Sequence, residues 1–258
     1  MTKKDSAAVI NIASIKAACK ECSLRELCLP FGLNESDLLS LDGIVKRRRT
    51  LRKGEYLYRM GEPLETLYAV RAGALKTSEL LDDGRIQVTG FQLPGEILGV
   101  DAIDGERHRC HAEALETSEV CEIPWSKLEE LARHIAGLQH QLLRLMSGEI
   151  GREGQLLLMI GKMSAEERLL ASLLNFSQRQ MRLGLSPVDI KLHMSRQDLG
   201  DYLGLALETV SRLFSRFQEE GLLTVRGKYV HLGNLDALHH RLGHHKADAS
   251  RQESWQKK

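Results

Sequence analysis

Three cysteines crowd into the ten residues CKECSLRELC, where Cys19, Cys22 and Cys28 have the spacing C-x2-C-x5-C. The other two of the five cysteines in the chain are Cys110 and Cys121. In a reducing compartment, an odd set of clustered thiols is more typical of metal binding or redox chemistry than of structural disulfides. Such short intervals let the backbone form a loop around a compact centre, and a [4Fe-4S] cluster or a zinc ion would then take a fourth thiolate. The spacing alone does not choose between Cys110 and Cys121 for that position.

Length and composition limit the class of protein. A chain of 258 residues can fold as two domains, and 42% hydrophobic with 28% charged residues is typical of soluble globular proteins. No apolar run approaches the length of a membrane span. The opening MTKKDSAAVINIASIKAA has only short apolar pieces and makes a poor signal peptide, so we expect a cytoplasmic protein without membrane contact.

The sequence after the cysteine-rich start divides into three regions. Their predicted strands and helices could position the thiols and a surface that binds a partner. Short alternating segments punctuated by glycine, from Val45 to Pro124, predict antiparallel strands that form a roll or sandwich. Asp83-Gly84 predicts a hairpin turn within it. We therefore predict a cysteine-rich segment over residues 1–30 and a β-roll domain over 31–137.

A long helical pattern follows over residues 138–161, and its apolar stripe includes Leu145. Three glycines weaken this helix by about 1 kcal/mol each relative to alanine, so it needs a surface to pack against. Acidic residues beside the stripe would be costly in a domain interior, which favours a homodimer interface over a buried core helix. The predicted interface residues are Leu142, Met146, Ile150, Glu153, Leu157 and Ile160.

The third region, 162–240, has the spacing of a helix-turn-helix. Ser195 followed by Asp198 predicts a capped helix, Gly204 the turn, and a second helix runs from about Leu207 to Glu220. Two short strands around Arg226-Gly227 predict a wing. On the second helix the outward-facing side chains match the chemistry of base recognition in double-stranded DNA, although an i,i+4 surface ion pair would also explain the charged ones. These side chains are Glu208, Ser211 and Arg212.

Taken in this order, a roll, a long helix and a winged helix-turn-helix resemble the cyclic-AMP receptor protein superfamily of transcription regulators. The cysteine-rich start and the segments TGF, ALETSEVCEIP, LMSGEI, AEERL and YLGLALETVSR are similar to its oxygen-sensing branch, the fumarate and nitrate reduction regulators. The resemblance runs from Cys19 to about Leu232. It implies an α+β fold: an N-terminal antiparallel β-roll of the cupin-like jelly-roll type, a central dimerisation helix and a C-terminal winged helix-turn-helix.

The same resemblance implies a cofactor and a mechanism. The fourth ligand of a [4Fe-4S] cluster lies in the VCEIP context, here Cys121, beside Cys19, Cys22 and Cys28. It also implies an activator that dimerises with the cluster intact, binds palindromic TTGAT-type sites, controls anaerobic genes and contacts RNA polymerase through the loop Asp82 to Arg85.

Two alternatives remain from the sequence. One is a cyclic-nucleotide-dependent regulator, which Val100 disfavours because the nucleotide-binding branch has a glutamate there, although Arg109 aligns with the phosphate-binding arginine of that branch. The other is a zinc-stabilised DNA-binding protein without redox response, since four thiolates also serve zinc. No nucleophile–base pair or phosphate-cradling loop has usable spacing, so we expect no enzyme. Residues 241–258 are predicted to form a disordered tail.

Overall fold

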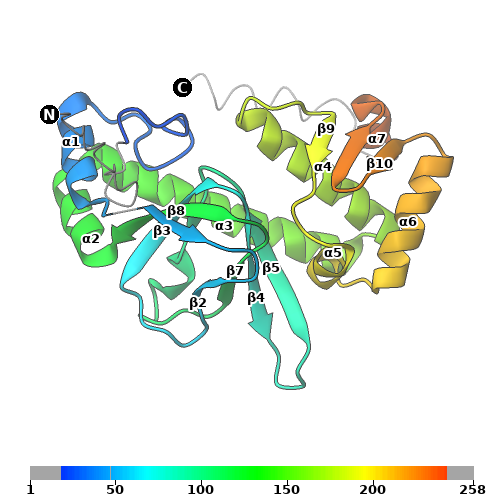
Figure 1. Ribbon diagram of the computed structural model, residues 1–258, viewed down its shortest axis with the longest axis horizontal. Coiled ribbons are helices and arrows are strands. Elements are labelled where there is room, and N and C mark those ends of the chain that lie inside the picture. Colours follow the sequence, from blue (N-terminus) through cyan, green and yellow to red (C-terminus); the bar gives the residue numbers. More distant parts are fainter. Residues whose placement is uncertain (1–18, 47, 243–258) are drawn as a thin grey trace, which may run out of the picture.

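The computed structural model describes residues 19–46 and 48–242. An N-terminal roll and a C-terminal helical domain lie at opposite ends of the long helix α3 (Ala136–Lys162), which runs behind both in Figure 1. The predicted tail at 241–258 falls almost wholly outside the described residues, as does most of the predicted segment 1–30. The fold class expected from the sequence is confirmed.

The roll consists of two four-stranded sheets in which every pairing is antiparallel. One sheet has the order β1-β8-β3-β6 and the other β2-β7-β4-β5. The strand bounds are β1 Arg48–Leu51, β2 Tyr56–Tyr58, β3 Thr66–Ala72, β4 Leu75–Leu80, β5 Ile86–Gln92, β6 Ile97–Leu98, β7 His111–Ala114 and β8 Ser118–Pro124. The hairpin predicted at Asp83-Gly84 joins β4 to β5, with Leu80 paired to Ile86.

Two helices and a loop close one end of the roll. The helices α1 (Glu35–Ile44) and α2 (Trp125–His134) pack with the start of α3 on a shared apolar cluster that includes Leu41, Leu128 and Leu138, each fully buried. A short 3-10 helix, η2 (Val100–Ala102), follows β6. The cysteine-rich loop packs on the same apolar cluster, so the predicted metal centre and the first turns of α3 share one core.

The C-terminal domain begins with α4 (Ala165–Arg182), where Ser164 and Glu167 form a capping box. Its helix-turn-helix consists of α5 (Arg196–Leu203) and α6 (Leu207–Glu219), as the sequence predicts. Gly204 ends α5 with φ +64°, a left-handed conformation that favours glycine. The remaining elements are β9 Asp189–Lys191, β10 Leu223–Arg226, β11 Tyr229–Leu232 and α7 Leu235–Arg241, the three strands forming one antiparallel sheet.

The roll and the C-terminal domain touch directly as well as through α3. A second apolar cluster combines Phe91 and Leu93 of the roll with Phe176 of α4 and Leu199 of α5. At its edge the Lys76 ammonium lies 2.6 Å from the Asp198 carboxylate. Among the described helices, none has both the length and the apolar character that crossing a membrane requires.

Candidate metal centre and nucleic-acid interface

The cysteine loop is built from successive turns. The Cys22 amide donates to the Cys19 carbonyl at 3.2 Å, and the Cys28 amide donates to the Leu24 carbonyl at 3.1 Å. The start of the loop is fixed to α1, because the Cys19 amide donates to the Asp42 carboxylate at 2.6 Å. These local bonds fold the segment between Cys19 and Cys28 back on itself, as the short spacing predicts.

Cys121 lies near the middle of β8, where it pairs with Arg48 of β1 and Ala69 of β3. Its side chain and those of Cys19 and Cys28 contact the same apolar cluster. The fold therefore brings a thiol from a strand of the roll to a loop that ends more than ninety residues earlier in the chain.

The pKa values of these thiols reflect both burial and the negative charges of one another. Burial raises the pKa of Cys28 to about 12, with a further contribution from Cys121 and Cys22. Burial also raises the pKa of Cys19, and so do Asp42, Cys28 and Cys121. The pKa of Cys121 is raised by burial and, among other charges, by Cys22.

Four thiolates at this location would be partly desolvated and would repel one another. A bound cation or cationic cluster would relieve that repulsion, and its binding would release the thiol protons. No three His, Cys, Asp or Glu side chains between residues 19 and 242, with residue 47 set aside, already converge on a common ion. The donor set fits a thiolate-bound metal group in chemistry and location, and the loop would tighten around it.

Cys110 belongs to a different part of the roll. It is buried in a third cluster, with Leu51, Leu57 and Val120, and its Sγ lies 3.5 Å from Asp101. Burial and the Asp101 carboxylate are the largest causes of the raised pKa of this thiol. The structure thus separates Cys110 from the group formed by the other four cysteines.

A direct link joins the cysteine loop to the first turns of α3. Gln141, whose side chain is buried, donates from Nε2 to the Cys28 carbonyl at 3.0 Å. One turn further along, the Arg144 guanidinium lies over the Phe31 ring, 4.5 Å from its centroid. The sequence analysis did not identify either residue. A glutamine at Gln141, directly before Leu142 of the apolar stripe, could have indicated a buried hydrogen bond.

The apolar stripe of α3 divides into two faces. Leu142 is only 8% exposed and packs inside the roll cluster of its own chain, so it does not lie on the free face where we predicted it. Leu143, Ile150 and Leu157, spaced by seven residues, are 58%, 69% and 73% exposed. Leu158, at 63%, lies beside them.

The other predicted interface residues lie at the edges of this free face. Met146 and Ile160 are half-buried and Glu153 is exposed. Partial burial and the neighbouring Glu149 raise the pKa of Glu153. At Gly151 and Gly154 an added Cβ would meet no atom of residues 19–46 or 48–242 within 4 Å, so the described part of the chain leaves these two positions open.

The second helix of the helix-turn-helix has one buried and one free face. Val210, Phe214 and Phe217 are buried, whereas the predicted DNA-contacting residues are all exposed: Glu208, Ser211 and Arg212. Within the described part of the chain, Glu208 and Arg212 form no ion pair with each other or with another residue. Their hydrogen-bonding groups are therefore available to a partner.

The wing and a neighbouring ion-pair network border this face. The wing strands β10 and β11 pair from Leu223↔Leu232 to Arg226↔Tyr229, which leaves Gly227 and Lys228 at the tip. Arg216 bonds Glu166 and Glu220, so it contributes to the packing of α6 rather than to its free face. Exposed polar side chains on α6 and a basic wing tip have the arrangement that winged helix-turn-helix proteins present to DNA.

Comparison with known proteins agrees with this architecture. Residues 48–134 match the model of the cyclic nucleotide-binding domain, and residues 192–223 match that of bacterial regulatory proteins of the crp family. The transcriptional activator protein anr of Pseudomonas aeruginosa is 49% identical over 86% of this chain and 91% of its own length. The fumarate and nitrate reduction regulatory protein of Escherichia coli is 46% identical over 88% of this chain and 90% of its own length.

A solved structure extends the likeness to three dimensions. FixK2 from Bradyrhizobium japonicum superposes with a TM-score of 0.69 at 36% identity, over 75% of this chain and 95% of that protein. The two sequence relatives are matched over about nine-tenths of their own length, so the likeness is not confined to one domain. The chain therefore belongs to the CRP/FNR family of transcription regulators, in the class of the fumarate and nitrate reduction regulators.

Proposed function

We propose that this transcription regulator responds to oxygen through a [4Fe-4S] cluster held by Cys19, Cys22, Cys28 and Cys121. The observation that supports the proposal is that Cys19, Cys28 and Cys121 contact one apolar cluster at one end of the roll, beside the first turns of α3, and that the charge of Cys22 acts on Cys28. When bound, the cluster would supply a redox-active iron–sulfur centre whose integrity requires all four thiolates.

The residues of the chain would connect that centre to DNA binding. Gln141 holds the carbonyl of the ligand Cys28, so the position of the loop bears directly on α3. The exposed row Leu143, Ile150 and Leu157 would meet the same row of a second copy, since an apolar repeat every seven residues suits a helical dimer.

A dimer would place two copies of α6 in successive major grooves of a palindromic TTGAT-type site, about one helical turn apart. Glu208, Ser211 and Arg212 would read the bases there. The exposed hairpin loop from Asp82 to Arg85 would contact RNA polymerase, an assignment that rests on resemblance to the family.

Cyclic-nucleotide binding is the second candidate, because the family model of that domain matches the roll. Two features weigh against it. Val100 stands where the nucleotide-binding branch has a glutamate, and Arg109 already pairs with the Asp104 carboxylate. The carboxylate of Asp101 also accepts the Arg109 amide at 2.8 Å.

The deciding experiment is the iron, acid-labile sulfide and zinc content of protein purified without air. We expect about four iron and four sulfide per chain. Serine at Cys19, Cys22, Cys28 or Cys121 should abolish both, whereas Cys110→Ser should retain them. Stoichiometric zinc without sulfide would replace the proposal with a structural zinc site.

A further inference from the structure

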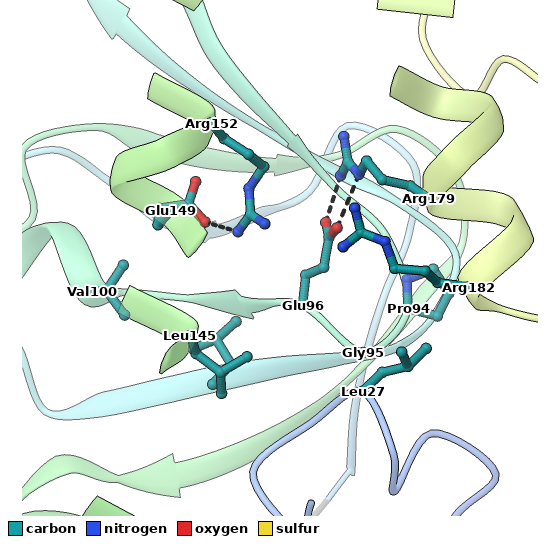
Figure 2. A pocket seen from close by; sticks show the side chains of 11 residues that line it. Leu27, Pro94, Gly95, Glu96, Val100, Leu145, Glu149, Arg152, Arg179 and Arg182 are labelled. Carbon is teal, nitrogen blue, oxygen red and sulfur yellow. Dashed lines mark hydrogen bonds and ion pairs between the residues drawn. The ribbon is translucent and has the colours of Figure 1, made fainter. Parts of the chain in front are cut away.

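A cavity of about 90 Å³ lies where the roll, the cysteine loop and the C-terminal domain meet. It opens between α3, α4 and the turn that precedes β6, as Figure 2 shows. Its charged lining is unusual for so small a space. The residues used below are Leu27, Glu96, Glu149, Arg152, Arg179 and Arg182.

Positive charge exceeds negative charge in this cavity. The Glu96 carboxylate accepts from Arg179 through both oxygens, at 2.9 Å from Nε and 2.5 Å from Nη2. The Glu149 carboxylate forms an ion pair with Arg152, which lies three residues further along α3. Both acids are thus engaged, and three guanidinium groups face two carboxylates.

Arg182 is the unpaired cation. It forms no hydrogen bond or ion pair within residues 19–46 and 48–242, and its guanidinium is turned toward Glu96 and the cavity in Figure 2. Although Arg182 is exposed to solvent at the mouth of the cavity, partial desolvation and the like charges of Arg179 and Arg152 lower its pKa, against the opposing effect of Glu96. An additional negative charge in the cavity would relieve this repulsion.

The chemistry and the size of the cavity define the ligand. Guanidinium groups present planar forks of N–H donors that match the oxygens of carboxylates and phosphates. A volume of about 90 Å³ is well below the roughly 300 Å³ at which drug-sized ligand pockets begin, which favours a small ligand over a nucleotide. We propose that the cavity binds a small oxyanion of the phosphate or carboxylate type between Arg152 and Arg182.

Such an anion would act on the junction between two helices. Arg152 belongs to α3 and Arg182 to the last turn of α4, so one ligand would bridge the central helix and the C-terminal domain. Leu27 of the cysteine loop forms part of the wall and packs tightly on Gly95, where an added Cβ would lie 2.8 Å from the Leu27 Cβ. An ordered cysteine loop would therefore complete the cavity. This last link rests on the proposed function, whereas anion binding itself does not.

The test is calorimetric titration of inorganic phosphate, and separately of succinate, into the full-length protein at constant ionic strength set with chloride. We expect saturable binding of at least one anion at millimolar or lower concentration, and the arm that binds identifies the ligand type. Arg182→Gln should weaken binding about tenfold or more, because a hydrogen bond to a charged group is lost. Arg133→Gln, an exposed arginine on α2, is the matched control and should bind as the parent does.

A second variant gives a change of opposite sign. Glu149→Gln removes the carboxylate that engages Arg152, so it should strengthen anion binding, which a purely structural role for these residues would not predict. Circular dichroism verifies that each variant is folded. Binding that is absent in both arms, or equal in the parent and Arg182→Gln, would overturn the proposal. Because this measurement needs no iron, its failure is distinguishable from failure of the cluster proposal.

Discussion

The ion pair between Glu96 and Arg179 joins the roll to the C-terminal domain, and its removal gives the sharpest test of how the two are held together. The residues are 83 positions apart in the chain, and their side chains are only 16% and 7% exposed. Arg179 also donates to the Phe91 carbonyl, and the Leu93 amide donates to Glu96 at 2.8 Å. We choose the substitution Glu96→Gln, which keeps the shape of the side chain and removes its charge.

The expected cost follows from burial. Removing one partner of a buried pair leaves the other charge uncompensated, which costs about 3–5 kcal/mol. Arg179 retains its bond to Phe91, so we expect a loss near the lower end, about 3 kcal/mol in the free energy of unfolding. Urea denaturation measures this loss in the free energy of unfolding. The buffer contains no phosphate, because an oxyanion in the adjacent cavity would partly replace the lost charge.

A matched control separates this pair from an ordinary surface pair. Glu129 and Arg133 lie 3.0 Å apart on α2 with side chains 48% and 70% exposed. An exposed i,i+4 pair contributes about 0.3–0.5 kcal/mol, so Glu129→Gln should cost no more than that. Equal losses for the two variants would refute the argument that burial makes the Glu96 pair important.

The dependence on pH gives an independent check. Burial alone would raise the pKa of Glu96, but the charge and hydrogen bonds of Arg179, with help from Arg152, lower the pKa overall. A carboxyl group whose pKa is lower in the folded state stabilises the fold above its unfolded pKa of about 4.3. That contribution is lost as pH falls through the folded-state pKa. The difference between the parent and Glu96→Gln should therefore shrink on acidification below about pH 4, and a growing difference would contradict the assignment.

Three further predictions follow from the proposed function. Gln141→Leu removes the hydrogen bond to the Cys28 carbonyl and should speed the loss of the visible iron–sulfur absorbance in air. The control Gln139→Leu, at an exposed position, should not, and equal rates would show that this hydrogen bond does not stabilise the loop. Leu157→Asp should abolish the dimer in sedimentation without lowering monomer stability, because this side chain is 73% exposed within the chain. In operator titrations, Arg212→Ala should lower the binding free energy by about 1–3 kcal/mol per half-site and relax the base preference at one position, whereas Lys228→Ala should weaken binding to all operators evenly. Uniform weakening by both variants would mean that neither residue reads bases.

The local elements were predictable because their information is local. Ser195 and Asp198 form the capping box that begins α5, and Gly204 ends it with the backbone conformation that the pattern predicts. The glycine-punctuated strands of the roll and the hairpin between β4 and β5 follow from turn chemistry in the same way. Such features depend on residues within a few positions of one another, so the sequence contains everything needed to infer them.

The face of α3 was harder to assign. Leu142 and Leu143 are adjacent, and one residue turns an α-helix by about 100°. Periodicity identifies an apolar stripe, but α3 has two such surfaces, one packed on its own roll and one exposed. Only the tertiary arrangement decides that Leu142 lies in the core while Leu143 joins Ile150 and Leu157 on the free face.

Contacts between residues far apart in the chain could not be predicted from the sequence, because they too depend on the tertiary arrangement. Spacing left Cys110 and Cys121 equivalent, and the pairing of β8 with β1 and β3 brings Cys121 to the core that the cysteine loop covers. The cavity between Arg152 and Arg182 likewise depends on how α3 and α4 cross, which no local pattern records.

The C-terminal end of α3 explains why a change at its start would reach DNA. Arg168 of α4 donates to the Met163 carbonyl at 2.9 Å, to the Ile160 carbonyl at 2.6 Å and to the Leu203 carbonyl at 3.1 Å. One side chain therefore fastens the last turn of α3 to the end of α5, immediately before the turn that leads to α6. Because a helix of 27 residues is stiff and spans about 40 Å, reorientation of α3 by the cysteine loop or by a second copy would carry the helix-turn-helix with it. Breaking the Arg168 bonds should thus uncouple DNA binding from the state of the cysteines while leaving dimer formation intact.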